Sequence, residues 1–190
     1  MLFDRTITRR DREYRITADL DDKALMDNDL TVVLSASYRE RKQGEWSEWQ
    51  TIRLTIRTDF EKRAIEVLDG DRVIARVPLD SEVPESVESE GNDLDVEGEG
   101  ESLRPHIDAG IWEGIIQDVP VDMFFGCIIK GAVSTLVGQI IRCCNRVEAK
   151  TDRLREYIGE IASCLKEHGL KMAFTFVCRA GRCMVLAGFG

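Results

Sequence analysis

Apolar and polar positions alternate with a period of two along residues 1–79, a pattern typical of β-strands that bury one face. The clearest segments are REYRITADL (12–20), TVVLSASY (31–38), TIRLTIR (51–57), AIEVL (64–68) and RVIARVPL (72–79). Gly70 separates the last two segments, and glycine tolerates the positive φ that a tight hairpin turn requires. KALMDN (23–28) fits a short helical turn. The pattern predicts a small antiparallel β-sandwich or open barrel.

The chain after residue 120 has a helical period instead. MFFGCIIKGAVSTLVGQIIRCC (123–144) is its most apolar stretch, and an apolar seam then continues to Leu165 in alternating steps of four and three residues. This heptad-like repeat predicts one helix over residues 121–168, about 70 Å long at 1.5 Å per residue. The alternative is a helical hairpin broken at Asn145, because Asn145 and Glu148 have the spacing of a capping box.

The apolar stretch covers most of the circumference of its helix, so it must be buried in protein or in lipid. We expect self-association through its seam, and the chain to form a homo-oligomer. The seam residues predicted to do this are Val133, Val137, Ile140, Val147, Leu154, Ile158, Ile161 and Leu165. Small residues on one side would let another helix approach closely. This small-residue packing face consists of Cys127, Gly131, Thr135 and Gly138.

The last segment, KMAFTFVCRAGRCMVLAGFG (171–190), alternates like a β-hairpin that turns at Ala180 and Gly181. A two-residue loop would place Cys178 opposite Cys183 as a thiol pair. Both faces of such a ribbon are apolar, so another sheet, helices or a second chain must cover it. The fold class expected for the whole chain is α+β, with an N-terminal antiparallel sandwich or open barrel, an acidic linker, and a long apolar helix followed by a β-hairpin.

Charge divides the chain into three parts. The net charge is −9, yet residues 80–103 alone hold ten carboxylates and no basic residue. Such a segment is typical of a flexible linker, because like charges repel and little apolar surface is available to bury. We therefore expect a β-rich recognition domain (1–79), this linker (80–103) and a helical self-association module (104–190). Neither flanking part has the basic stripe of a nucleic-acid-binding protein, so no nucleic acid partner is expected.

A membrane segment is the alternative interpretation of the apolar stretch. Residues 120–141 reach the roughly 20 residues that span a bilayer. However, Lys130 near the centre costs on the order of 3 kcal/mol on insertion, and Gln139 adds to that cost. The first 30 residues lack the apolar core of a secretory signal, which favours a cytoplasmic location. A membrane-anchored or membrane-active effector inserting residues 120–141 remains the second hypothesis.

Sequence motifs for catalysis are missing: there is no phosphate loop, dinucleotide fingerprint, nucleophile elbow or HExxH pair. We expect no enzyme, no cofactor and no metal. The six cysteines lack the C-x2-C spacing of zinc knuckles, so most are interpreted as small core residues. A zinc site formed by Cys143 and Cys144 with Cys178 and Cys183 is an alternative, as is a redox pair.

Two tryptophans, Trp46 and Trp49, lie in the connection GEWSEWQ (44–50). The run WSEW is similar to the WSxWS box of cytokine-receptor domains, but it lacks the final serine and any paired-cysteine context, so it implies no family membership. Two such tryptophans either close the end of a sheet or anchor a binding surface, since tryptophan is enriched at interface hot spots. The sequence therefore favours a non-enzymatic interaction protein that binds another protein through its β-domain.

Overall fold

The computed structural model describes residues 1–80, 123–148 and 153–186. The predicted linker lies outside the described residues, except for Asp80. Residues 104–122 of the predicted self-association module also lie outside the described residues.

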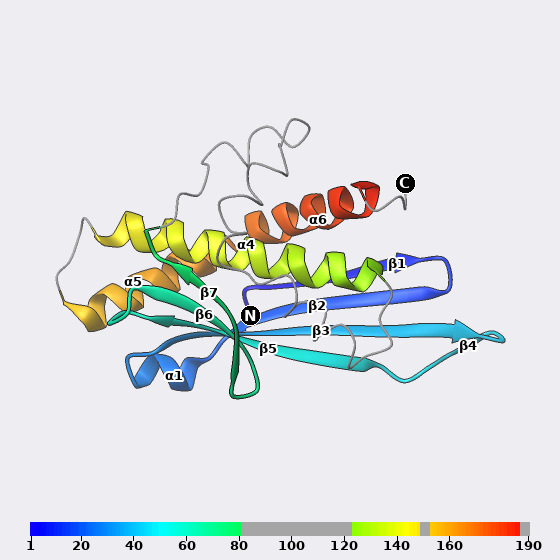
Figure 1. Ribbon diagram of the computed structural model, residues 1–190, viewed down its shortest axis with the longest axis horizontal. Helices are drawn as coiled ribbons and strands as arrows, with labels where there is room; N and C mark the ends of the chain where they lie inside the picture. The colour runs from blue at the N-terminus through cyan, green and yellow to red at the C-terminus, as the bar shows by residue number, and fades with distance from the viewer. Residues whose placement is uncertain (81–122, 149–152, 187–190) are drawn as a thin grey trace.

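The N-terminal strands form one antiparallel sheet in the order β1-β2-β3-β5-β6-β7, with β4 paired to the end of β3 (Figure 1). The strands are β1 (Phe3–Arg9), β2 (Arg12–Leu20), β3 (Leu30–Lys42), β4 (Glu45–Trp46), β5 (Gln50–Asp59), β6 (Ala64–Asp69) and β7 (Arg72–Pro78). The predicted short helix is also present as α1 (Asp22–Met26), where the side chain of Asp21 accepts a hydrogen bond from the Ala24 amide. The α+β class is confirmed. In the described part of the chain, a single sheet replaces the expected sandwich or barrel, because helices cover its apolar face.

Residues with positive φ lie in the hairpin turns of the sheet, two of which follow β6 and β3. Gly70, at φ 61°, lies in the two-residue loop between Asp69 and Arg72, which pair directly. Gln43 and Gly44 have φ values of 53° and 84° in the loop between β3 and β4. Positive φ at both central residues is the signature of the type I′ turn, whose twist matches that of the strands. The predicted β6–β7 hairpin is confirmed.

Within the described residues, three helices cover one face of the sheet: α4 (Met123–Glu148), α5 (Leu154–Glu167) and α6 (Gly169–Leu186) (Figure 1). α4 packs against β2, β3, α5 and α6. The rings of Tyr14 and Phe124 lie 4.7 Å apart, and those of Tyr38 and Phe125 lie 5.9 Å apart, so aromatic contacts join β2 and β3 to the start of α4. The buried inner face of β2, β3 and β5 includes Tyr14, Ile16, Ala18, Leu20, Leu30, Val32, Leu34, Ala36, Tyr38, Ile52, Leu54 and Ile56.

The single helix predicted over residues 121–168 is wrong. The chain leaves α4 after Glu148, and α5 folds back against α4. The helical hairpin is therefore the better description, although Asn145 lies inside α4 rather than at its end. A helix that is apolar around most of its circumference needs cover on several sides, and the turn supplies it by bringing Ile158, Ile161 and Leu165 into the same core.

The predicted C-terminal β-hairpin is also wrong, because residues 169–186 form α6. Apolar residues in this segment fit both periods, and the helical face formed by Met172, Phe176 and Ala180 is the one that is buried. α6 approaches α4 closely at Gly131, where a Cβ atom would lie 3.3 Å from the Ala180 amide nitrogen. The sequence of this segment fits the period of a strand and that of a helix almost equally well. Burial of one helical face against α4 favours the helix.

The seam expected to drive self-association lies inside this fold. Seven of its eight residues belong to one hydrophobic core, and Leu154 is exposed at 52%. Strands from residues 1–79 and helices from residues 123–186 contribute to that same core. The two segments predicted as a recognition domain and a self-association module therefore share their apolar interior.

One helix in the described residues, Phe124–Val147, is long and apolar enough to cross a membrane, but 89% of its most apolar window is buried inside the protein. Lys130 is the one exposed residue between Phe124 and Arg142. Its side chain lies at the edge of the packed helix, which is where a lysine is accommodated without burying its charge.

Gly169, at the junction of α5 and α6, is a sensitive test of how the helices meet β1. A Cβ atom there would lie well inside van der Waals contact of the Leu2 carbonyl oxygen, whereas a Cβ at Gly159 would meet nothing within 4 Å. We expect Gly169→Ala to lower the free energy of unfolding by about 1–3 kcal/mol. Gly159→Ala should leave it unchanged or raise it by up to about 1 kcal/mol. Urea denaturation of both variants would measure this, and equal effects would contradict the close approach.

Candidate functional site

The outer face of the sheet, opposite the helices, carries a group of aromatic and charged side chains at one end. β3 continues beyond the helices at this end and turns into β4 (Figure 1). Trp46 and Trp49 are both partly exposed here, at 38% and 39%. The structure thus brings together the two tryptophans that the sequence suggested as a partner surface.

Arg39 lies between the two tryptophans. Its guanidinium carbon is 4.8 Å from the ring centroid of Trp46 and 4.4 Å from that of Trp49. Glu13, on the neighbouring strand, forms an ion pair with Arg39, and Arg41 lies 5.9 Å from the ring of Trp46. Stacking between a cation and an indole ring contributes about 0.5–1 kcal/mol at exposed sites. We call Glu13, Arg39, Arg41, Trp46 and Trp49 the Arg–Trp cluster.

Backbone hydrogen bonds hold the segment that carries the tryptophans. The Ser47 amide donates to the Glu40 carbonyl oxygen at 2.7 Å, and the Glu40 amide donates to the Ser47 hydroxyl at 3.0 Å. Next to them, the hydroxyl groups of Ser37 and Thr51 are 2.9 Å apart across β3 and β5. The Arg–Trp cluster is therefore arranged before any partner arrives.

A buried carboxylate lies further along the same outer face. Glu66 is 2% exposed and accepts hydrogen bonds from Arg76 at 2.8 Å and from Arg57 at 3.0 Å. Arg76 and then Arg57, by these hydrogen bonds, hold the pKa of Glu66 below its usual value, against the opposing effect of burial. The carboxylate bridges β5 and β7 across β6, which makes it a structural link.

The link predicts a specific pH dependence. Because the folded-state pKa of Glu66 is lowered, its contribution to stability is fully present above the unfolded-state pKa of about 4.3 and is lost as the pH falls through the folded-state value. Glu66→Gln should lower the free energy of unfolding by about 1–2 kcal/mol at neutral pH, since both arginines remain half-exposed. The difference from the wild type should shrink below about pH 4.

Urea denaturation at several pH values would measure this, with Glu61→Gln at the exposed turn before β6 as the matched control. A destabilisation by Glu66→Gln that stays constant from neutral to acidic pH would show that the charge is not what matters.

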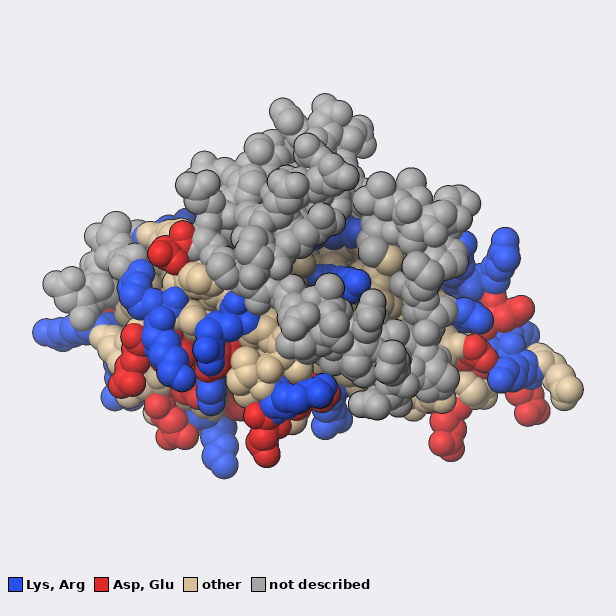
Figure 2. All heavy atoms as spheres, in the orientation of Figure 1, with Lys and Arg blue, Asp and Glu red and all other residues tan. Residues whose placement is uncertain are grey.

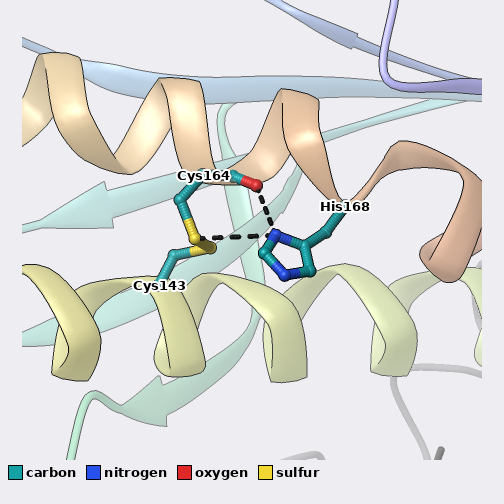
Figure 3. A group of neighbouring side chains, drawn as sticks. All are labelled: Cys143, Cys164 and His168. Atoms are coloured by element: carbon teal, nitrogen blue, oxygen red, sulfur yellow. Dashed lines mark hydrogen bonds between the residues drawn. A yellow bond between two sulfur atoms is a disulfide. The ribbon is translucent and has the colours of Figure 1, made fainter.

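A second group of side chains lies between α4 and α5. Cys143 of α4 and Cys164 of α5 form a disulfide, with Cα atoms 5.9 Å apart (Figure 3). His168 follows Cys164 by one helical turn, and its Nδ1 lies 3.8 Å from the Cys164 sulfur and 2.7 Å from the Cys164 carbonyl oxygen. We call these three residues the Cys–His cluster. Closing a loop of this length by a disulfide stabilises a fold by about 3 kcal/mol.

The prediction that most cysteines are plain core residues is wrong for Cys143 and Cys164, and Cys127 is disulfide-bonded as well. Cys178 is a free, half-buried thiol on α6. The expected cross-strand pairing of Cys178 with Cys183 has no strands to support it, since both residues belong to α6 and the Cys183 side chain lies outside the described part. The suggested zinc set that joins Cys143 to Cys178 is not assembled either, because the sulfur of Cys143 is bonded to Cys164.

Sequence reasoning missed Arg39 and His168. Arg39 is seven residues from Trp46, and only the turn at Gln43 and Gly44 brings the two together. The spacing of Cys164 and His168 could have been noticed, because residues four apart share one face of a helix. The sequence does not show, however, that Cys143 of α4 lies opposite these two residues.

Charges on the described surface are mixed in sign. Figure 2 shows Lys and Arg interspersed with Asp and Glu across the face in view. Several ion pairs among the described residues join neighbouring strands, including Asp4 with Arg15, Glu13 with Arg39, and Glu66 with both Arg57 and Arg76. Such a surface favours neither a polyanion nor a polycation as partner.

Comparison with known proteins adds no further constraint on either cluster: no family model, no curated protein and no solved structure matches this chain.

Proposed function

We propose that this protein is a non-enzymatic binding protein whose Arg–Trp cluster recognises a protein partner. The observation that carries the proposal is the position of Arg39 between two partly exposed tryptophans. Tryptophan and arginine are the residues most enriched among binding hot spots, because they bury large surfaces and still offer directed polar contacts.

The surroundings of the cluster support this role. The cluster lies at the end of the sheet that projects beyond the helices, so a partner can approach it without displacing them (Figure 1). The ion pair with Glu13 and the hydrogen bonds of Ser47 fix the side chains in advance. A fixed surface loses less conformational entropy on binding, so more of its contact energy appears as affinity.

The partner can be identified by photo-crosslinking from position 48, which is exposed and adjacent to Trp49. A photoreactive phenylalanine analogue in place of Glu48 should capture a protein that the same analogue in place of Met26 does not. Met26 is the matched control, since it is 81% exposed and lies on α1 at the opposite end of the sheet (Figure 1).

With that partner purified, Trp46→Ala and Trp49→Ala should each weaken binding at least tenfold, about 1.4 kcal/mol or more. Isothermal titration calorimetry measures the loss, and circular dichroism checks that the sheet is intact. Unchanged affinity in the double variant, or the same crosslinked proteins from both positions, would contradict the proposal.

Self-association is a second candidate function, carried by a different surface from the seam that the sequence suggested. Leu170, Phe174 and Val177 follow one another along α6 and are exposed at 81%, 63% and 43%. A row of exposed apolar side chains on one helix is typical of an interaction surface. A second copy of the chain is the simplest partner for it. Insertion of residues 120–141 into a bilayer would instead require α4 to leave the core.

We expect the wild-type protein to form a concentration-dependent oligomer that Leu170→Ser with Phe174→Ser shifts to monomer. Leu154→Ser is the matched control, because Leu154 is an exposed leucine of α5 outside this row. Sedimentation equilibrium would measure the change. A wild-type monomer at every concentration, or an equal effect of Leu154→Ser, would rule out the α6 surface.

A further inference from the structure

The Cys–His cluster contains more polar groups than a structural disulfide needs. A buried disulfide is uncharged and its sulfurs are weak hydrogen-bond acceptors, so it requires no polar neighbours. Nevertheless, the side-chain amide of Gln139, itself 5% exposed, donates to the Cys143 sulfur at 3.4 Å. On the other side, the imidazole of His168 lies against Cys164 (Figure 3). Both neighbours are of the kind that stabilises a negatively charged thiolate sulfur.

We propose that Cys143, Cys164 and His168 form a zinc site when the disulfide between the two cysteines is reduced. Thiolate and imidazole are the ligands that zinc prefers in proteins. One ligand atom from each of the three residues lies within 4.8 Å of the others. In a tetrahedral zinc site with bonds of about 2.0–2.3 Å, neighbouring ligand atoms are about 3.6 Å apart. The His168 Nδ1 lies 3.8 Å from the Cys164 sulfur, so the imidazole ring is already beside one of the two sulfur ligands.

Each residue reaches the site from a fixed position. Cys143 is in α4, Cys164 is in α5, and His168 caps the C-terminal end of α5, where its backbone amide donates to the Cys164 carbonyl oxygen. Its Nδ1 contacts the same carbonyl oxygen at 2.7 Å and therefore carries the proton in that hydrogen bond. Metal-binding histidines commonly donate one ring N–H to a carbonyl group and bind through the other nitrogen. Nε2 is therefore the nitrogen left to ligate the zinc, once the ring turns toward the two sulfurs.

Charge balance makes the site compatible with burial. Two thiolates neutralise Zn²⁺, so the core gains no net charge, and the Gln139 amide stabilises the Cys143 sulfur. Cys143 and Cys164 are nearly fully buried, whereas His168 is only half-buried. The metal therefore enters from the His168 side, and water completes the fourth position there.

The chemistry links the site to the redox state of the protein. A dithiol reductant gives two electrons and two protons to the disulfide, so the S–S bond breaks, two protein thiols form, and the reductant becomes a disulfide. Zinc then binds both sulfurs and displaces their two protons. A small-molecule disulfide accepts two electrons from the two thiolates and is reduced to two thiols, which restores the protein disulfide and releases the metal.

Cobalt(II) and zinc binding to the full-length protein would test this proposal. Under anaerobic conditions, the reduced protein should bind about one equivalent of Co²⁺, with thiolate charge-transfer bands and the visible bands of tetrahedral Co²⁺, and Zn²⁺ should displace it. The oxidised protein should bind neither metal. His168→Gln and Gln139→Leu should each weaken zinc binding about 10–100-fold, measured by competition with a chromogenic chelator.

Controls separate this site from other thiols that reduction exposes. Cys127→Ser removes another cysteine that reduction frees, and Cys178→Ser removes a free cysteine of α6; both should leave zinc binding unchanged, whereas Cys143→Ser should abolish it. His168→Gln leaves every thiol in place, and circular dichroism would verify its fold. Three results would overturn the proposal: no metal bound by the reduced protein, wild-type affinity in His168→Gln, or unfolding on reduction that zinc does not reverse.

Discussion

Burial of α4 against the inner face of the sheet is the contact on which the rest of the structure depends. The helix is apolar around most of its circumference, and no single surface can cover such a helix. The sheet covers one side, and α5 and α6 cover others. The turn after Glu148, the helical state of residues 169–186 and the convergence of Cys143 with Cys164 all follow from this requirement.

The strands were predictable because each buries one face and exposes the other. β2 begins and ends where its alternating pattern does, at Arg12 and Leu20, and the turn at Gly70 is a local signal. β1 was missed, since Arg5 and Arg9 interrupt the apolar positions of a strand at the edge of the sheet. The period-two pattern therefore predicts a strand correctly wherever one face of the sheet is buried and the other is exposed to solvent.

Residues 171–186 show where local reasoning fails. The run AFTFV alternates like a strand, yet Phe176 and Ala180 also share one helical face. The free energy of packing that face against α4 settles the choice, and no window of sequence contains it. The heptad seam led to the wrong prediction of one continuous helix for a similar reason. Its steps of three and four residues continue in the same register in α4 and in α5, although these are two separate helices. With Cys143 and Cys164 in one straight helix, about 30 Å would separate them, so their bond could not be foreseen.

The two clusters differ in how far sequence can reach them. Trp46 and Trp49 stand out by residue type, so a binding surface could be suggested before any fold was known. Arg39 and the Cys–His cluster depend on a turn that joins separate elements, and such turns are tertiary information. The sequence suggests two tryptophans as a binding surface, and the structure adds the three charged side chains that surround them.

The position of β1 has a consequence for how the protein is made. Phe3 stacks on Phe176 with ring centroids 6.0 Å apart, and Leu2 lies against Gly169. The sheet can form early from hairpins between neighbours in sequence, but its apolar face stays uncovered until α4, α5 and α6 leave the ribosome. During that interval the nascent chain presents the kind of surface that holding chaperones bind and that drives aggregation. We therefore expect slow translation through residues 80–186 to lower the yield of folded protein.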